Sequence, residues 1–370
     1  MRRTRAIFLI GSLVILVGVA AASPAGASNS FIGPFNKIDV ISSTIPSNGD
    51  INPYGVAVVP NSVGTLIRGD VLVSNFNNSS NLQGTGTTIV QVDPNTMVAS
   101  LFARIDPMHL PGPCPGGVGL TTALGVLSRG WVIVGSLPTS DGMSDTAKAG
   151  CLLVLDSQGK VRETISGRPI NGPWDMATVD MGRRAVLFVT NVLNGTVNGG
   201  GKVVNRGTVL RIELAVHRAK PPTVGSKRII GSGFGERTDP SALVVGPTGV
   251  ALGQGDVLFV ADTVANRIAA LPDALHRQSS AFTGLDVSSN GALNGPLGLT
   301  SAPNGDILTV NAGDGNIVET TPAGDQIDMK TLDSTGSPPG AGTLFGLAVV
   351  PGGTGVYFVD DGSNTLNLLH

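Results

Sequence analysis

The chain is poor in aromatic and charged residues. Aromatic residues make up 4% and charged residues 14% of its 370 positions, and there are four His. The formal net charge of −2 gives no sign of the basic surface that nucleic-acid binding requires. No phosphate loop, dinucleotide motif or Ser–His–Asp spacing stands out. We therefore expect no nucleic-acid partner, and candidate catalytic groups are few.

Cysteine is nearly absent. The chain has two, Cys114 and Cys151, an even number that favours one disulfide in an exported protein. A pair of reactive thiols is the alternative, but it lacks a CxxC spacing and a neighbouring His. The expected bridge encloses much of one repeat.

Long apolar runs are absent after the N-terminus. Arg2, Arg3 and Arg5 precede the apolar residues 7–22, and the small residues 25–27 follow. This pattern predicts a signal peptide over residues 1–27, cleaved after Ala27. An uncleaved anchor is the alternative, although the run is short for a span. We expect a secreted, periplasmic or cell-envelope protein with no membrane span after cleavage.

Glycine and one short pattern are abundant. The 52 glycines separate many short apolar stretches, and no long helical periodicity appears. Six times, at intervals of roughly 60 residues, a small residue opens an apolar strand, and a turn and a second apolar strand follow. The aligned small positions are Gly55, Gly119, Asp175, Ala242, Gly298 and Gly346.

Each repeat has room for four short strands, which need about 40–50 residues with their turns. The pattern predicts an all-β, six-bladed β-propeller over residues 28–370, with blades starting near residues 52, 117, 173, 240, 296 and 344. The sixth copy has only three strands, the last being Thr365–Leu369. We expect residues 35–42 to pair with that strand and close the ring. Crowding at the axis explains the small aligned residues, with Asp175 as the exception.

Residues 256–268, Asp-Val-Leu-Phe-Val-Ala-Asp-Thr-Val-Ala-Asn-Arg-Ile, resemble an NHL repeat. The resemblance implies the propeller fold over about residues 50–370. The chain also resembles a wider group of six-bladed propellers that includes gluconolactonases, calcium-dependent lactonases, amidating lyases and adhesive domains. Fold alone does not choose among these activities.

Three long loops are the candidate binding surface. Residues 75–86, 136–150 and 191–207 follow the second strands of the first three blades, at one rim of the ring. Long loops on a rigid scaffold often bind ligands, and unselected drift is the alternative. Our main hypothesis is an exported scaffold that binds a small molecule, glycan or protein. Residues 202–237 hold eight Lys or Arg and two Glu, which we interpret as solvated loops.

The same rim gathers oxygen side chains of the kinds that calcium prefers. Calcium is the one cofactor that the sequence suggests, and we expect Asp175, Asn191 and Asp262 to hold it. The alternative is that these residues only form turns and strand ends, where Asn and Asp are also common. The alternative function is a calcium-dependent lactonase with Asp175 central. Ligand-rim candidates are Tyr54, Asn75, Trp174 and Asp361, with Tyr54 and Trp174 more typical of the core. A self-associating envelope protein is a third hypothesis.

Overall fold

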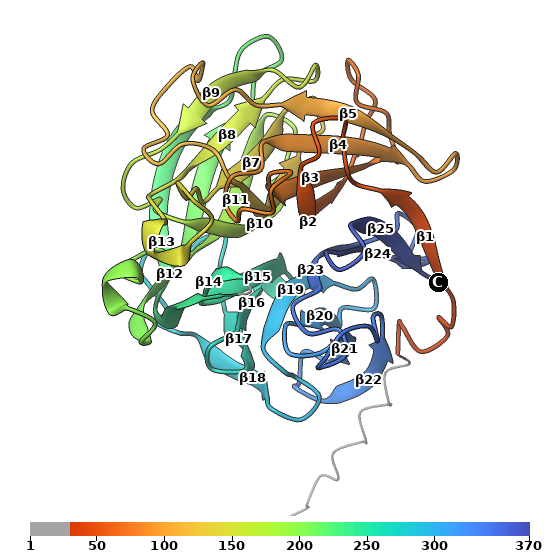
Figure 1. Ribbon diagram of the computed structural model, residues 1–370. Coiled ribbons are helices and arrows are strands. Elements are labelled where there is room, and N and C mark those ends of the chain that lie inside the picture. The colour runs from red at the N-terminus through yellow and green to blue at the C-terminus, as the bar shows by residue number, and fades with distance from the viewer. Residues whose placement is uncertain (1–29, 241) are drawn as a thin grey trace, which may run out of the picture.

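The chain forms a ring of six antiparallel sheets (Figure 1). The computed structural model describes residues 30–240 and 242–370, so the predicted signal peptide lies outside the described residues. The helices of these two ranges are single 3₁₀ turns, and none is long and apolar enough to cross a membrane. The predicted all-β, six-bladed β-propeller is confirmed.

Each blade begins with an innermost strand and proceeds outward (Figure 1). Blade 1 contains β2 (Ile51–Val58), β3 (Val71–Asn77), β4 (Thr88–Asp93) and β5 (Val98–Arg104). Blade 2 contains β6 (Leu120–Val126), β7 (Val132–Ser136), β8 (Cys151–Leu155) and β9 (Val161–Ile165). Blade 3 contains β10 (Pro173–Asp180), β11 (Arg184–Asn191), β12 (Val204–Ala215) and β13 (Thr223–Asp239). Blade 4 contains β15 (Pro247–Leu252), β16 (Leu258–Asp262), β17 (Arg267–Leu271) and β18 (Leu285–Ser289). Blade 5 contains β19 (Pro296–Ser301), β20 (Ile307–Asn311), β21 (Asn316–Thr320) and β22 (Gln326–Thr331). Blade 6 contains β23 (Leu344–Val349), β24 (Val356–Asp360) and β25 (Thr365–Leu369).

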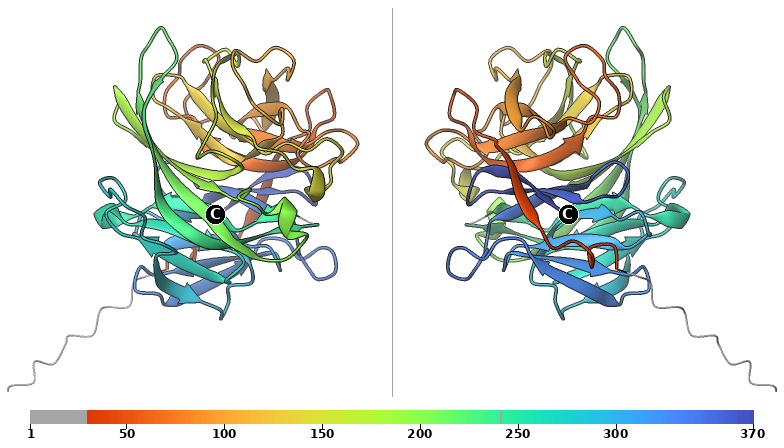
Figure 2. Two further views of the ribbon diagram at one scale, coloured as in Figure 1. Left: turned by 90° about the vertical axis from the view of Figure 1, so that its left-hand side faces the viewer. Right: turned by 90° about the vertical axis from the view of Figure 1, so that its right-hand side faces the viewer.

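The N-terminal strand completes the sixth blade, as predicted. β1 (Ile38–Ser43) runs antiparallel to β25, with Ile38 opposite Leu369 and Ser42 opposite Leu366. Figures 1 and 2 show this red strand beside the blue last blade. The two chain segments are also joined by a contact of 2.8 Å between His370 Nε2 and an Asp39 carboxylate oxygen. The ring is thus closed by strand pairing, which leaves no open seam between its first and last blades.

The predicted innermost strand of blade 4 was wrong. The apolar run that ends at Gly246 is instead β14 (Leu243–Val245), which pairs with β13 as a fifth strand of the third sheet. The innermost strand is the next one, β15. Two apolar runs lie one after the other here, and the first is apolar because it packs into the core over the axis. The small residue of blade 4 is therefore Gly249 rather than Ala242.

Strand pairing also moves the small position of blade 2. In blade 2, Leu124 of the inner strand pairs with Val134 of the second strand. In blade 3, Met176 pairs with Val189 in the same way. The preceding residues, Ala123 and Asp175, are therefore equivalent, and Gly119 is not the small residue of blade 2. The six equivalent residues are Gly55, Ala123, Asp175, Gly249, Gly298 and Gly346. A Cβ on Gly298 would lie inside van der Waals distance of the Phe345 carbonyl in the next blade. The axial crowding expected from the sequence is therefore real, and Asp175 is its one exception among these positions.

The predicted disulfide is confirmed. Cys114 and Cys151 are bonded, with their Cα atoms 5.2 Å apart. The bridge joins the loop before β6 to the start of β8. It holds the loop that precedes blade 2 against the third strand of the same blade.

Candidate functional site

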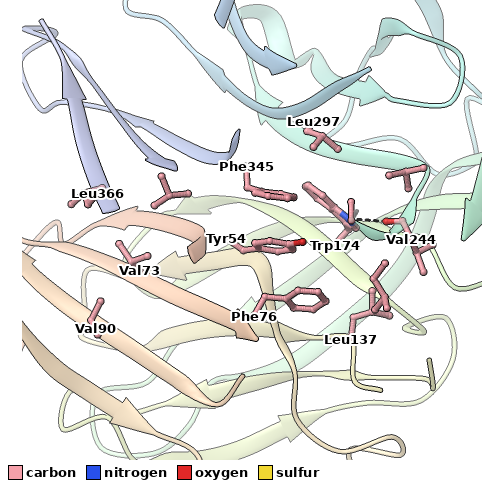
Figure 3. Packing of buried hydrophobic residues seen from close by; sticks show 14 of the residues in the cluster. Tyr54, Val73, Phe76, Val90, Leu137, Trp174, Val244, Leu297, Phe345 and Leu366 are labelled. Carbon is pink, nitrogen blue, oxygen red and sulfur yellow. Dashed lines mark hydrogen bonds between the residues drawn. The ribbon is translucent and has the colours of Figure 1, made fainter. Parts of the chain in front are cut away.

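An aromatic cluster fills one end of the axis. Tyr54, Trp174, Leu297 and Phe345 precede the small residue of their innermost strands, and each is at most 2% exposed. The Tyr54 ring stacks on Phe345 with centroids 3.9 Å apart and on Phe76 with centroids 4.4 Å apart (Figure 3). Trp174 Nε1–H donates to the Val244 carbonyl at 3.1 Å. These rings are core, so Tyr54 and Trp174 do not present a face to a ligand at this rim.

The long loops of blades 2 and 3 complete this apolar plug. Leu137 and Ala147 come from the first of these loops, and Val192 and Val197 from the second; all four belong to or pack against the same cluster. The blade 1 loop also reaches across, because Gln83 Nε2–H donates to the Pro240 carbonyl at 2.7 Å. The loops that we expected to form a binding rim therefore pack over the axis and cover it.

Below the plug, a channel of about 570 Å³ runs along the axis, lined by all six innermost strands. Exposure increases along three of these strands, β10, β19 and β23. In β10, Pro173 to Met176 are buried, Ala177 to Val179 are half-buried and Asp180 is exposed. β19 and β23 show the same gradient. The channel is therefore closed at the start of the inner strands and opens at their ends, opposite the loops favoured by the sequence.

Asp175 lies at the closed end of this channel and is 8% exposed. One carboxylate oxygen accepts the Met176 N–H at 2.8 Å, and the other accepts the Val250 N–H of the next blade at 3.1 Å. Burial raises the pKa of Asp175 to about 7, although both hydrogen bonds act in the opposite direction. At neutral pH this carboxyl therefore populates both protonation states, which suits a group that accepts and returns a proton.

Hydroxyl groups supply the other polar atoms of the channel. Thr122 is 4% exposed and lines the same end as Asp175, and its Oγ1 has no hydrogen-bond partner among the described residues. Thr178, Thr300 and Ser301 lie nearer the mouth. Sequence reasoning missed Thr122 because blade 2 carries one extra residue in its first strand. The channel exposes polar and apolar surface in about equal amounts, so the site is a narrow channel of mixed polarity with an acid at its closed end.

The other two proposed metal ligands, Asn191 and Asp262, bond to other groups of the protein. Asn191 Oδ1 accepts the N–H groups of Asn171 and Gly172, both at 2.8 Å, and its Nδ2 donates to Pro169 and Thr208. Asp262 is paired with Arg267 Nε at 2.9 Å. These side chains fix the loop and strand ends of their own blades. The structure does not gather them around Asp175.

The two remaining rim candidates lie at the plugged end. Asn75 is fully buried and donates to the Thr44 carbonyl at 3.0 Å. Asp361 follows β24 and is half-buried. Burial, and then the charge of Asp360, raises its pKa to about 7. Asp361 thus has the same titration range as Asp175 but lies on the other side of the plug.

The channel does not fit a calcium ion. Calcium takes six to eight oxygen ligands, yet the five positions equivalent to Asp175 are glycine or alanine, and both oxygens of Asp175 already accept backbone N–H groups. Within residues 30–240 and 242–370, no group of three His, Cys, Asp or Glu side chains is arranged to hold a metal. The chemistry of the site must therefore be derived from Asp175 and the hydroxyl groups.

Comparison with known proteins supports the fold. The sequence matches no protein-family model and no curated protein. Among solved structures, a gluconolactonase from Xanthomonas campestris aligns with a TM-score of 0.56 at 12% identity, over 90% of this chain and 88% of that one. Regucalcin from Agrobacterium tumefaciens, a calcium-binding protein, gives 0.55 at 13%, over 90% and 93%. A luciferin-regenerating enzyme gives 0.53 at 10%, over 90% and 94%. The structural neighbours are thus propellers that include gluconolactonase.

Proposed function

We propose that this protein hydrolyses small lactones in its axial channel, with Asp175 as the general base. The observation that carries the proposal is a buried carboxyl with a pKa of about 7 at the closed end of a channel that a small molecule can enter. The likeness to a gluconolactonase structure supports the choice of an enzyme over the binding scaffold of our main sequence hypothesis. The packing of the long loops over the axis supports it as well.

The reaction needs one proton to be held and returned. The Asp175 carboxylate accepts a proton from a water molecule as that water attacks the lactone carbonyl carbon. The ring C–O bond then breaks, and the proton passes to the departing alkoxide to give a hydroxy acid. Thr122 lies at the same end of the channel, but its hydroxyl oxygen is buried, so the proton transfers are assigned to Asp175 alone.

The channel wall does not select an alkyl lactone over a sugar lactone. Five apolar residues contribute to the wall, but their side chains are buried in the hydrophobic clusters of the core: Leu124, Met176, Val250, Leu299 and Leu347. The surface that remains exposed is as polar as it is apolar. A δ-alkyl lactone and δ-gluconolactone therefore both serve as test substrates.

Hydrolysis measured in EDTA tests the proposal. The mature chain should hydrolyse a δ-alkyl lactone above the buffer rate, and Asp175→Asn should lower kcat by about 100-fold or more, the usual contribution of a general base. Asp361→Asn is the matched control, because Asp361 has an equally raised pKa on the far side of the plug. No hydrolysis of any lactone, or equal rates for wild type and Asp175→Asn, would overturn the proposal.

We also propose that the protein acts outside the cytoplasm, secreted or in the periplasm or cell envelope. The proposal rests on the signal-like residues 1–27 and is supported by the Cys114–Cys151 disulfide. The NHL character of the repeat stays a proposal that rests on residues 256–268. Secretion of the chain with loss of residues 1–27 tests the first point. Retention of the full-length chain in the cytoplasm would contradict it.

A further inference from the structure

A second cavity, of about 790 Å³, lies along the seam between blades 2 and 3, outside the axial channel. The loop before β10 supplies Arg168 to Asn171, and the long loop of blade 3 supplies Leu193 to Gly195. β12 and the very long strand β13 form the other wall. Figure 2 shows the curved hairpin of these two strands in green. We call this cavity the seam groove.

Three cationic side chains line the seam groove, and none of the described residues on its lining is an acid: Arg168, Arg206 and Lys227. None of the three forms an ion pair with the residues that the structure describes; the pairs it records involve other cations. A buried acid, Glu236, attracts Arg206 through its charge, but its carboxylate is directed into the loop, where it accepts the Asn194 N–H at 2.8 Å and the Thr196 hydroxyl at 3.0 Å. Three like charges thus share one cavity whose lining carries no carboxylate.

Arg228 also borders the groove, but its side chain leaves from the other face of β13. Its Nη1 donates to the Gln278 carbonyl of blade 4 at 2.8 Å, and its buried Nε is not accessible from the groove. Lys227 is half-buried; its Nζ donates to the Ser166 carbonyl at 2.7 Å, and burial lowers its pKa. An anion in the groove would relieve the repulsion between the cations that share it.

We propose that the seam groove binds a small ligand that carries phosphate or sulfate groups. Tetrahedral oxyanions accept the forked hydrogen bonds of arginine, and two of the three cations, Arg168 and Arg206, are arginine. The cavity volume is that of a small-molecule site. The site is independent of the channel and of the lactone proposal.

Pyrophosphate is the probe, measured by calorimetry and by thermal shift against sodium chloride of equal ionic strength. We expect saturable binding and a rise in Tm that the chloride does not produce. The double variant Arg168→Gln/Arg206→Gln should weaken binding at least tenfold; both side chains are exposed, so the fold should be retained. Arg104→Gln, an exposed arginine on blade 1, should stay within twofold.

Glucose 6-phosphate and glucose 6-sulfate then separate the two ester types, and Asp175→Asn should bind pyrophosphate like the wild type. Absence of saturable pyrophosphate binding would overturn the proposal. Equal weakening by Arg104→Gln would do so too, because it would indicate non-specific attraction to surface charge.

Discussion

At the scale of single residues, Asp175 combines a structural cost with a chemical use. Its side chain occupies a position where the equivalent residues are glycine or alanine, and it bridges to the next blade through the Val250 N–H. The same burial that makes the charged form unfavourable gives a carboxyl that titrates near neutrality. The protein therefore keeps an acid where packing alone favours no side chain.

The raised pKa predicts how stability depends on pH. The folded state holds the Asp175 proton up to about pH 7, whereas the unfolded chain releases it near pH 4. This stabilisation is complete below the unfolded pKa and is lost as the pH rises through about 7, with a total on the order of 4 kcal/mol. Asp175→Asn should therefore flatten the fall in unfolding free energy between pH 4.5 and 8, measured by urea denaturation.

Part of that fall must remain in Asp175→Asn, because burial also raises the pKa of Glu236 and Asp361 to about 7. The variant loses an acceptor for a backbone N–H, so it should also be less stable than wild type at pH 5. A pH dependence identical to that of wild type would show that Asp175 titrates normally.

The axial glycines give a second test at this scale. A Cβ at Gly298 would meet the Phe345 carbonyl inside van der Waals distance, and that carbonyl is backbone and has little freedom to move. We expect Gly298→Ala to lower the unfolding free energy by about 3 kcal/mol or more. Gly225→Ala is the control, because its Cβ would lie 3.6 Å from its nearest neighbour. Equal stabilities would mean that the inner strands are not tightly packed.

At the scale of elements, closure of the ring depends on β1. Ile41 is 5% exposed and packs into the central cluster, whereas Val40, beside it in the same strand, is 60% exposed. Ile41→Ala should therefore cost about 2–4 kcal/mol, and Val40→Ala should change stability by less than about 0.5 kcal/mol. Chemical denaturation of both variants measures the difference. Equal, small effects would show that β1 does not latch the ring.

The elements were largely predictable because alternating apolar strands and Asn-Gly or Asp-Gly turns depend on local sequence. Blade 5 and the closing strand were found in this way. Blade 4 was misassigned because Leu243–Val245 is as apolar as an inner strand, although it pairs at the other edge of blade 3. Only the tertiary packing of these side chains shows that the segment is a fifth strand of the third sheet and not the inner strand of blade 4.

The open end of the channel could not be predicted in the same way. The sequence indicated that Tyr54 and Trp174 are more typical of the core, with a ligand-binding rim as the alternative. Leu137, Val192 and Val197 were the available signal, since apolar residues within long loops indicate that the loops are packed. Two of the predicted oxygen ligands are strand-end residues with other partners: the Asn191 amide oxygen accepts backbone N–H groups of the preceding loop, and Asp262 is paired with Arg267.

At the scale of the whole molecule, the ring is accessible from one side of its axis only. The plug places Asp361 and the long loops on one face and leaves Asp175 to the channel that opens on the other. The seam groove is a third, separate region with opposite charge. Lactone chemistry and anion binding can therefore be disabled independently.

Calcium should have little effect on this molecule. With glycine or alanine at the five positions equivalent to Asp175, excess calcium should shift Tm by less than about 1 °C, whereas a tight ion specific to the folded state would raise it by several degrees. Thermal melts in calcium and in EDTA measure this. A large calcium shift would mean that an ion site forms from residues that the structure keeps apart.

The pH dependence of kcat/KM for a δ-alkyl lactone, corrected for spontaneous hydrolysis, tests the central claim most directly. Because the Asp175 carboxylate is the base, the rate constant should rise about tenfold per pH unit below pH 7 and level off above it. That inflection should be absent in Asp175→Asn and unchanged in Asp361→Asn. The same inflection in Asp175→Asn, or one near pH 4 in the wild type, would contradict the account.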